Sequence, residues 1–351
     1  MSEALDRSEN IRLLRDSAAA IVTATDLKRI RALRQQDPGF DPAVWRDMCD
    51  LGWVALRVAE PQGGTGLGMQ EYVALAEELG RGLVPEPLIP CAMAAQVLTG
   101  PALAELLSGR RVIIPAWQER ANTLDLAGDT TVAGGRANGR KVFVPMAAGA
   151  DAFLVSGRDG MALVERHAAG VHLAIERTQD GGNYGTLSLD NAPCTPVAGD
   201  MSAALEEAAL ATAGYLLGVM ERAFAMTLDY LRTRQQFGRP IGSFQALQHR
   251  AADLKIQVSL ARASVESAAV TLDSSSVPAL RLSAVSRAKA RAADAAMIVT
   301  RQSIQLHGGI GYTDEYDVGL FLRKAMVLAN LYGSAHLHRG RFAATAPDDD
   351  E

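Results

Sequence analysis

The sequence predicts an α+β protein in which a β-domain lies between two helical domains. Before residue 110 and after residue 200, apolar residues recur at spacings of three and four, as in helices that bury one face. Between these regions, short β-rich runs are separated by Gly, Asp and Asn. We therefore predict an N-terminal helical domain at 1–110, a middle antiparallel β-domain at 111–199 and a C-terminal four-helix bundle at 200–346, followed by an acidic tail at 347–351.

The N-terminal domain contains an amphipathic helix and a glycine-rich run. The helix is predicted over Glu71–Val84, where one apolar stripe is formed by Tyr72, Leu75, Leu79 and Leu83. The run Gly63–Gly68 has the composition of a phosphate-binding turn. However, Pro42–Leu56 before it reads as a helix, and no acidic residue follows where a βαβ unit would place one. We interpret the run as a tight connection between helices.

The middle domain is predicted from six short runs of strand-forming residues. No helical pattern separates them, which favours an antiparallel barrel or sandwich over a doubly wound sheet. In chain order the runs are RVIIPAW, KVFVP, AFLVSG, MALVE, VHLAI and TLSLD.

The C-terminal domain is predicted to contain four helices joined by short turns. They span about 202–232, 244–272, 279–306 and 317–342. The second shows the longest regular pattern, because its apolar residues alternate spacings of three and four throughout, which is typical of bundle helices. That pattern consists of Phe244, Leu247, Ala251, Leu254, Val258, Ala261, Val265, Ala268 and Leu272.

Composition excludes several classes of protein. The 351 residues include 35 Lys plus Arg and 40 Asp plus Glu, a net charge of −5 that gives nucleic acid no broad phosphate-binding surface. The three cysteines, Cys49, Cys91 and Cys194, are too far apart for a metal site or a disulfide framework, and His336 and His338 do not share a helical face. The polar N-terminus and the lack of an apolar run of about 18 residues predict a cytoplasmic protein with no membrane span.

One candidate binding segment lies at the turn between the first two bundle helices. Gly238 and Pro240 end one helix there, and Arg234, Gln236, Phe237 and Gln245 cluster around the turn. An Arg beside amide side chains near a helix N-terminus can hold a pyrophosphate. The alternative is that Arg234 is a solvated helix-end residue and Phe237 belongs to the core.

A second candidate segment follows the third bundle helix. Gln305 is followed after two residues by Gly308, Gly309 and Gly311, and such glycines permit close approach of a ligand to the backbone. The alternative is a helix C-terminus followed by an irregular link, with His307 as a structural helix-end residue.

These two segments resemble signatures of the acyl-CoA dehydrogenase family. The matching stretches are RTRQQFGRPIGSFQALQHRAADL and QLHGGIGYTDEYDVGLFLRKA, together with AEPQGGTGLGMQEYVALAEELGR near the N-terminus. The resemblance implies α,β-dehydrogenation of an acyl-CoA: a carboxylate removes the α-proton, and the β-hydrogen leaves as hydride to the N5 atom of FAD. It further implies electron transfer to an electron-transfer flavoprotein.

The family also suggests roles for the candidate residues. By resemblance, residues near the first turn would contact the FAD of a neighbouring subunit: Arg234, Gln236, Phe237, Phe244 and Gln245. Gln305, Gly308 and Gly309 would lie against its pyrophosphate and adenosine portion.

The sequence departs from the family at the catalytic base. The family's usual Glu aligns with Tyr332, and a phenol with a pKa of about 10 is a poor general base. Some members carry the base on the first bundle helix, at the position that corresponds to Ala208. The adjacent Glu207 is one helical step, about 100°, away from that direction. Glu207 is a candidate base, and the alternative is a solvated acidic residue in the first helical turn.

A further departure lies where family members contact their own flavin ring. The usual Thr-Glu-Pro-Gly run is reduced to Gln118-Glu119-Arg120-Ala121, and the usual Trp-Ile-Thr/Ser run is Phe143-Val144-Pro145. Pro145 has no N–H to offer, whereas Gln118 can donate a hydrogen bond to flavin.

Three functions are compatible with this pattern. The first is a subunit of a heteromeric acyl-CoA dehydrogenase that supports FAD bound with a homologous catalytic partner, as in bacterial enzymes that shorten steroid side chains. The second is a self-sufficient homo-oligomeric dehydrogenase that uses Glu207 as its base. The third is a non-catalytic scaffold that retains the bundle for oligomerisation. We expect the first, because a scaffold has no evident need for the groups around Arg234 and Gln305.

Overall fold

The computed structural model describes residues 2–23, 25–34 and 36–345, so the predicted acidic tail lies outside the described part of the chain. The chain divides into two compact units that do not follow the predicted domain boundaries. The bundle unit comprises Met1–Leu27, Met69–Val84 and Ala209–Glu351, and the β unit comprises Lys28–Gly68 and Pro85–Ala208. The region predicted as an N-terminal domain is therefore shared between the two units.

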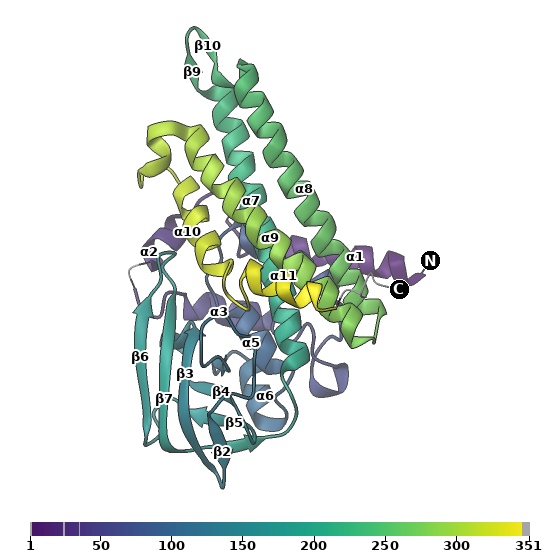
Figure 1. Cartoon of the computed structure of the whole chain (residues 1–351), viewed down its shortest axis with the longest axis vertical. Coiled ribbons are helices and arrows are strands. Elements are labelled where there is room, and N and C mark those ends of the chain that lie inside the picture. The colour runs from purple at the N-terminus through teal and green to yellow at the C-terminus, as the bar shows by residue number, and fades with distance from the viewer. Residues whose placement is uncertain (1, 24, 35, 346–351) are drawn as a thin grey trace. The chain divides into compact units, whose positions relative to one another are not determined.

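The bundle unit is built around three long helices, α7 (Ser202–Thr233), α8 (Gln245–Ser274) and α9 (Pro278–His307). Figure 1 shows α8 and α9 side by side, with the hairpin of β9 (Gln235–Gln236) and β10 (Arg239–Pro240) joining α7 to α8. The remaining elements of this unit are α1 (Ser2–Ala18), α4 (Met69–Arg81), η3 (Ile241–Ser243), η4 (Gly308–Tyr312), α10 (Val318–Leu328) and α11 (Ala335–Ala343).

The helix predicted over 317–342 is wrong as a single element, because a turn separates α10 from α11. Tyr332 and Gly333 have φ angles of 55° and 103°, which an α-helix cannot contain. The Ser334 hydroxyl then accepts a hydrogen bond from the Leu337 N–H and so begins α11 as its N-cap.

Small residues let α4 approach α7 closely. A Cβ atom at Gly80 would lie 2.0 Å from the Tyr215 carbonyl oxygen, and one at Gly218 would lie 1.9 Å from the Glu77 carbonyl oxygen. Helix α7 is long and apolar enough to cross a membrane, but 89% of its apolar window is buried inside the protein. This burial is what a core helix requires.

The β unit contains two four-stranded sheets, ordered β1-β4-β5-β8 and β2-β3-β7-β6. The pairing is antiparallel, as predicted, except between β1 and β4, which are parallel. The strands are β1 (Ile113–Ala116), β2 (Thr131–Ala133), β3 (Arg136–Pro145), β4 (Ala152–Gly157), β5 (Gly160–Glu165), β6 (Val171–Arg177), β7 (Asn183–Pro193) and β8 (Thr195–Val197).

Short helices complete the β unit. They are α2 (Lys28–Leu33), α3 (Pro42–Asp50), η1 (Glu60–Gln62), α5 (Leu88–Ala95), α6 (Gly100–Leu107) and η2 (Ala147–Gly149). Helix α3 ends at Asp50, not at Leu56 as predicted, and turns follow it. The glycine-rich run connects η1 to α4, and a Cβ atom at Gly64 would lie 1.9 Å from the Val58 carbonyl oxygen. The run is therefore a tight connection whose packing requires glycine.

Candidate functional site

The hairpin between α7 and α8 presents an aromatic side chain in a strained backbone conformation. Phe237 and Gly238 have φ angles of 55° and 79°, the pattern of a type I′ turn. A left-handed conformation is costly for a bulky residue. The Phe237 side chain is also 89% exposed, so the alternative that it belongs to the core is wrong. A strained residue held at an exposed tip is typical of a functional contact.

Arg234 stands at the base of this hairpin. Its backbone N–H donates to the Tyr230 carbonyl (2.8 Å), and its carbonyl accepts from the Ile241 N–H (2.8 Å). The side chain is exposed, and among the described residues its guanidinium has neither a hydrogen bond nor an ion pair. The side chains of Gln236 and Gln245 are exposed as well. The backbone is thus fixed while three polar side chains point to solvent.

Phe244 stiffens the hairpin from its other side. Its ring lies 4.2 Å from the Arg239 guanidinium carbon and 6.0 Å from the Phe237 ring, which meets it edge-on at 89°. Such cation–π and edge-to-face contacts hold an otherwise isolated hairpin in one arrangement. Sequence reasoning missed Arg239, although an arginine five residues before an aromatic residue across a tight turn is a recognisable signal.

The double-glycine turn follows α9. Gly308 ends the helix with a φ of 66°, which a side chain would strain. Gly309 has no positive φ, and a Cβ atom there would meet nothing within 4 Å. The chain itself therefore gives no steric reason for glycine at 309. Gln305, Gly308 and Gly309 are all exposed.

The structure brings these two segments together. The Tyr230 ring, one helical turn before Arg234, stacks on the His307 ring with centroids 4.6 Å apart. His307 immediately precedes Gly308. We call the exposed groups on both sides of this contact the support surface, which consists of Arg234, Gln236, Phe237, Gln245, Gln305, Gly308 and Gly309.

In the β unit, the residues that replace the family's flavin-contacting run are engaged within the chain. The Gln118 amide donates to the Arg120 carbonyl (2.9 Å). The Glu119 carboxylate accepts from the Asp129 N–H (2.6 Å), the Thr130 N–H (2.9 Å) and the Lys141 ammonium (2.7 Å).

The charges of Glu119 and Lys141 are both satisfied by groups of the same chain. Burial alone would raise the pKa of Glu119, but its hydrogen bonds outweigh burial and lower the pKa to about 2. Lys141 is fully buried, which lowers its pKa despite the neighbouring carboxylate, and its ammonium also donates to the Trp117 carbonyl (3.1 Å). Sequence reasoning missed Lys141; a lysine beside the apolar run VFVP was the available signal.

The second run, Phe143-Val144-Pro145, is partly buried. Phe143 has a φ of 55° at a register shift in β3 and is 43% exposed, while Pro145 is buried and pairs with Tyr184 of β7. Pro145 therefore offers neither a donor nor an accessible surface to a flavin.

Glu207 is held by Arg57. Its two carboxylate oxygens accept from Arg57 at 2.9 Å (Nε) and 2.7 Å (Nη2), and Arg57 also donates to the Leu67 carbonyl. The side chain is 6% exposed. The expectation of a solvated residue is therefore wrong, because the Glu207 carboxylate is buried in an ion pair with Arg57. A carboxylate engaged on both oxygens is poorly placed to accept a further proton from a substrate.

Tyr332 lies in the turn between α10 and α11 and is 2% exposed. The turn is held by two buried side chains. The Lys289 ammonium donates to the carbonyls of Leu328 (3.2 Å), Ala329 (3.0 Å) and Gly333 (3.0 Å). His338 Nε2 lies 2.9 Å from the Tyr332 carbonyl oxygen.

Burial also shifts the titration of both side chains that hold this turn. It lowers the pKa of Lys289 to about 7 and, with the Lys289 charge nearby, the pKa of His338 to about 4. Sequence reasoning missed Lys289, whose signal was its place among buried alanines of α9.

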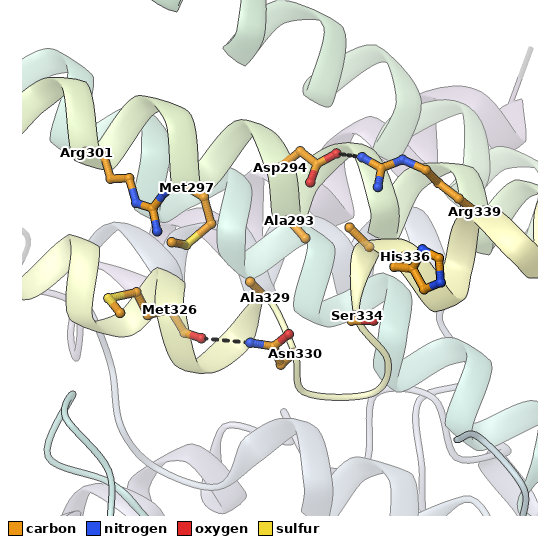
Figure 2. Close-up of a pocket in the computed structure, with 11 residues that line it drawn as sticks. Ala293, Asp294, Met297, Arg301, Met326, Ala329, Asn330, Ser334, His336 and Arg339 are labelled. Carbon is orange, nitrogen blue, oxygen red and sulfur yellow. Dashed lines mark hydrogen bonds and ion pairs between the residues drawn. The ribbon is translucent and has the colours of Figure 1, made fainter. Parts of the chain in front are cut away.

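A pocket of about 450 Å³ lies between α9, α10 and α11 (Figure 2). Tyr332 is not among its lining residues, so the side chain at the family's base position faces the core. One wall carries the ion pair between Asp294 and Arg339. The pocket is lined by Ala293, Asp294, Met297, Arg301, Met326, Ala329, Asn330, Ser334, Ala335, His336 and Arg339. Within the described ranges, no group of three His, Cys, Asp or Glu residues could hold a metal ion.

Known proteins match both parts of this chain. Residues 8–105 match the acyl-CoA dehydrogenase N-terminal domain, and residues 199–346 match the C-terminal domain. Acyl-CoA dehydrogenase IpdE2 of Mycolicibacterium smegmatis is 32% identical over 334 residues, which cover 93% of this chain and 95% of IpdE2.

Solved structures agree with this assignment. A chain of the ChsE4-ChsE5 complex from Mycobacterium tuberculosis is 27% identical with a TM-score of 0.84, covering 97% of this chain and 98% of that chain. A chain of the Tcur3481-Tcur3483 steroid ACAD is 28% identical with a TM-score of 0.85 and the same coverage. This chain therefore belongs to the acyl-CoA dehydrogenase family of FAD-dependent oxidoreductases.

Proposed function

We propose that this chain is a subunit of a heteromeric acyl-CoA dehydrogenase, and that its support surface holds FAD bound with a homologous catalytic partner. The observation that carries the proposal is the exposed Arg234 guanidinium, which has no partner among the described residues, on a segment that the Tyr230–His307 contact joins to the open Gly309. Both features fit a ligand that the chain itself does not enclose.

The support surface suits the pyrophosphate of FAD. A guanidinium offers paired donors to phosphate oxygens, and glycines without a Cβ permit the backbone N–H groups to approach. Arg234, Gln305 and Gly309 would hold the pyrophosphate and adenosine portion, and Phe237 would pack against the partner. Bound FAD supplies the acceptor for the hydride that leaves the β-carbon of the acyl-CoA.

The β unit does not suit a flavin ring of its own. The Gln118 amide, the Glu119 carboxylate and the Lys141 ammonium all have partners within the chain, and Pro145 is buried. A flavin bound there would have to compete with these internal bonds. This supports a complex in which the isoalloxazine ring and the substrate lie with the partner.

The catalytic base is proposed to come from the partner for a related reason. Tyr332 is buried, and both Glu207 oxygens are engaged by Arg57. The homo-oligomeric alternative requires Glu207 to leave that ion pair, which is costly for a buried carboxylate. Heteromeric relatives such as the ChsE4-ChsE5 complex support two different chains, and the Tcur3481-Tcur3483 steroid ACAD supports a steroid-derived acyl-CoA as substrate.

The proposal is tested by purifying the chain alone and together with a homologous chain encoded beside it. We expect flavin absorbance and acyl-CoA-dependent bleaching only in the complex. A chain that alone binds stoichiometric FAD and is bleached by an acyl-CoA would contradict the proposal. Colourless preparations with every partner would instead favour a scaffold.

Variants of the complex then locate the cofactor contact. Arg234→Ala should weaken FAD binding at least about tenfold, because it removes a charge-assisted hydrogen bond. Arg232→Ala, which removes an exposed arginine two residues away that pairs with Asp229, is the matched control and should leave FAD binding unchanged.

A further inference from the structure

His307 joins the two halves of the support surface. Its ring packs against two tyrosines: it stacks on Tyr230, with centroids 4.6 Å apart and 30° between planes, and lies 4.8 Å from the Tyr316 centroid with 45° between planes. Tyr230 and Tyr316 themselves are 6.2 Å apart. The three rings come from α7, α9 and the link that precedes α10.

The contact between Tyr230 and His307 joins the segment that carries Arg234 to the double-glycine turn. Tyr230 accepts the backbone hydrogen bond of Arg234, and His307 is bonded directly to Gly308. The packing of the Tyr230 and His307 rings therefore links the backbone position of Arg234 to that of the double-glycine turn. A pyrophosphate of fixed size requires both to lie at matched positions.

The imidazole is held in one orientation and one tautomer. Nδ1 lies 2.7 Å from the Ser303 carbonyl oxygen, and since a carbonyl only accepts, Nδ1 must carry the proton. The residue is 2% exposed, and burial lowers the pKa of its imidazole, which favours the neutral ring. Nε2 has no hydrogen-bonding partner among the described residues. The ring thus acts through its flat faces.

We propose that His307 is a positioning residue for the cofactor: by packing with Tyr230 and Tyr316 in a three-ring cluster, it fixes the span between Arg234 and Gly308–Gly309 so that both engage one FAD molecule. The inference rests on the proposed function of the support surface. It adds a residue that does not touch the cofactor but sets the geometry of those that do.

Three variants of the heteromeric complex test this. His307→Leu removes the stack and should weaken FAD binding at least about tenfold, measured by flavin fluorescence on assembled complex. His307→Phe keeps a flat ring packed against both tyrosines and should stay within about twofold of the unchanged complex. His338→Leu removes another fully buried histidine of the bundle unit, away from the support surface, and should not change FAD affinity.

A second measurement needs no cofactor. Hydrogen exchange of the Arg234 and Ile241 amides in the chain alone should accelerate in His307→Leu and not in His307→Phe, because the base of the hairpin loses its anchor. If His307→Leu keeps the affinity and the exchange rates of the unchanged protein, the inference is wrong. It is equally wrong if His307→Phe loses as much affinity as His307→Leu.

The outcomes also separate this inference from the proposed function. If Arg234→Ala weakens FAD binding and His307→Leu does not, only the positioning role fails. If neither variant changes FAD binding, the support surface itself is not the cofactor contact.

Discussion

Two surfaces that family resemblance connects with flavin differ in how their polar groups are satisfied. On the bundle unit, the Arg234 guanidinium is exposed without a partner among the described residues, and Gly309 faces open space. In the β unit, the Glu119 carboxylate accepts three hydrogen bonds from its own chain. The comparison teaches that the charges of Glu119 and Lys141 in the β unit are satisfied within the chain, whereas the Arg234 guanidinium has no partner among the described residues.

The largest effect is expected in the cluster that Glu119 and Lys141 form in the β unit. Lys141→Met removes a buried ammonium that bonds Glu119 and the Trp117 carbonyl, and should lower the free energy of unfolding of the β unit by about 3 kcal/mol. All three tryptophans lie in this unit, so urea unfolding followed by tryptophan fluorescence reports on it. Lys28→Met, at an exposed lysine of the same unit, is the control.

Measuring FAD binding should show that Lys141→Met does not affect the support surface. Complex that contains Lys141→Met and is still folded should hold FAD as tightly as the unchanged complex. A selective loss of FAD would mean that the cluster of Glu119 and Lys141 contacts the cofactor.

The second largest effect is expected from acid, which protonates Glu119 and removes its contribution to stability. Because the folded-state pKa of Glu119 is about 2 rather than the ordinary 4.5, the unfolded chain takes up a proton first as the pH falls. The stabilisation from Glu119 is fully present above about pH 4.5 and is lost as the pH approaches 2. We expect Glu119→Gln to flatten this loss in fluorescence-detected urea unfolding at pH 6, 4 and 3. Glu60→Gln, at an exposed glutamate of the same unit, should follow the unchanged protein; equal slopes for all three proteins would refute the assignment.

A smaller effect is expected at the support surface. Gly309→Ala places a methyl group where nothing in the chain lies within 4 Å, so the free energy of unfolding should change by less than about 0.5 kcal/mol. FAD affinity of the complex should nevertheless fall about tenfold, because the methyl group would meet the pyrophosphate. Gly340→Ala, at another glycine with open space in α11, should leave FAD affinity unchanged. Equal affinities for both variants would remove Gly309 from the cofactor contact.

Sequence patterns were enough for the long elements and insufficient for their interruptions. The sustained spacing of apolar residues located α7, α8 and α9 to within a few residues, because burial of one helical face is a local property of the sequence. The turn at Tyr332 was missed because the Lys289 and His338 bonds that hold it come from other helices. The parallel pairing of β1 with β4 was missed for the same reason, since strand order is not local.

The candidate site shows the same division. The residues of the support surface could be named from their resemblance to family signatures, whereas the contact between Tyr230 and His307 that joins their two segments is not predicted by any spacing. The closure of the β unit could not be foreseen, because the donors to Glu119 are Asp129, Thr130 and Lys141, which are 10, 11 and 22 residues away. The pairing of Glu207 with Arg57 spans 150 residues.

The smallest expected effect concerns the strain at the hairpin tip. Phe237→Gly and Phe237→Leu both lose the edge-to-face contact with Phe244, and only Phe237→Gly removes the cost of a left-handed side chain. Relative to Phe237→Leu, Phe237→Gly should therefore stabilise the hairpin by about 1 kcal/mol, seen as slower hydrogen exchange of the Ile241 amide. The same variant should weaken assembly with the partner, because the 89% exposed ring is lost. Phe237→Leu keeps the backbone strain and loses only the aromatic ring, so it should weaken assembly without slowing exchange. If Phe237→Gly slows exchange relative to Phe237→Leu and also assembles as tightly as the unchanged chain, Phe237 makes no contact with the partner, and the support surface does not extend beyond Arg234 to the hairpin tip.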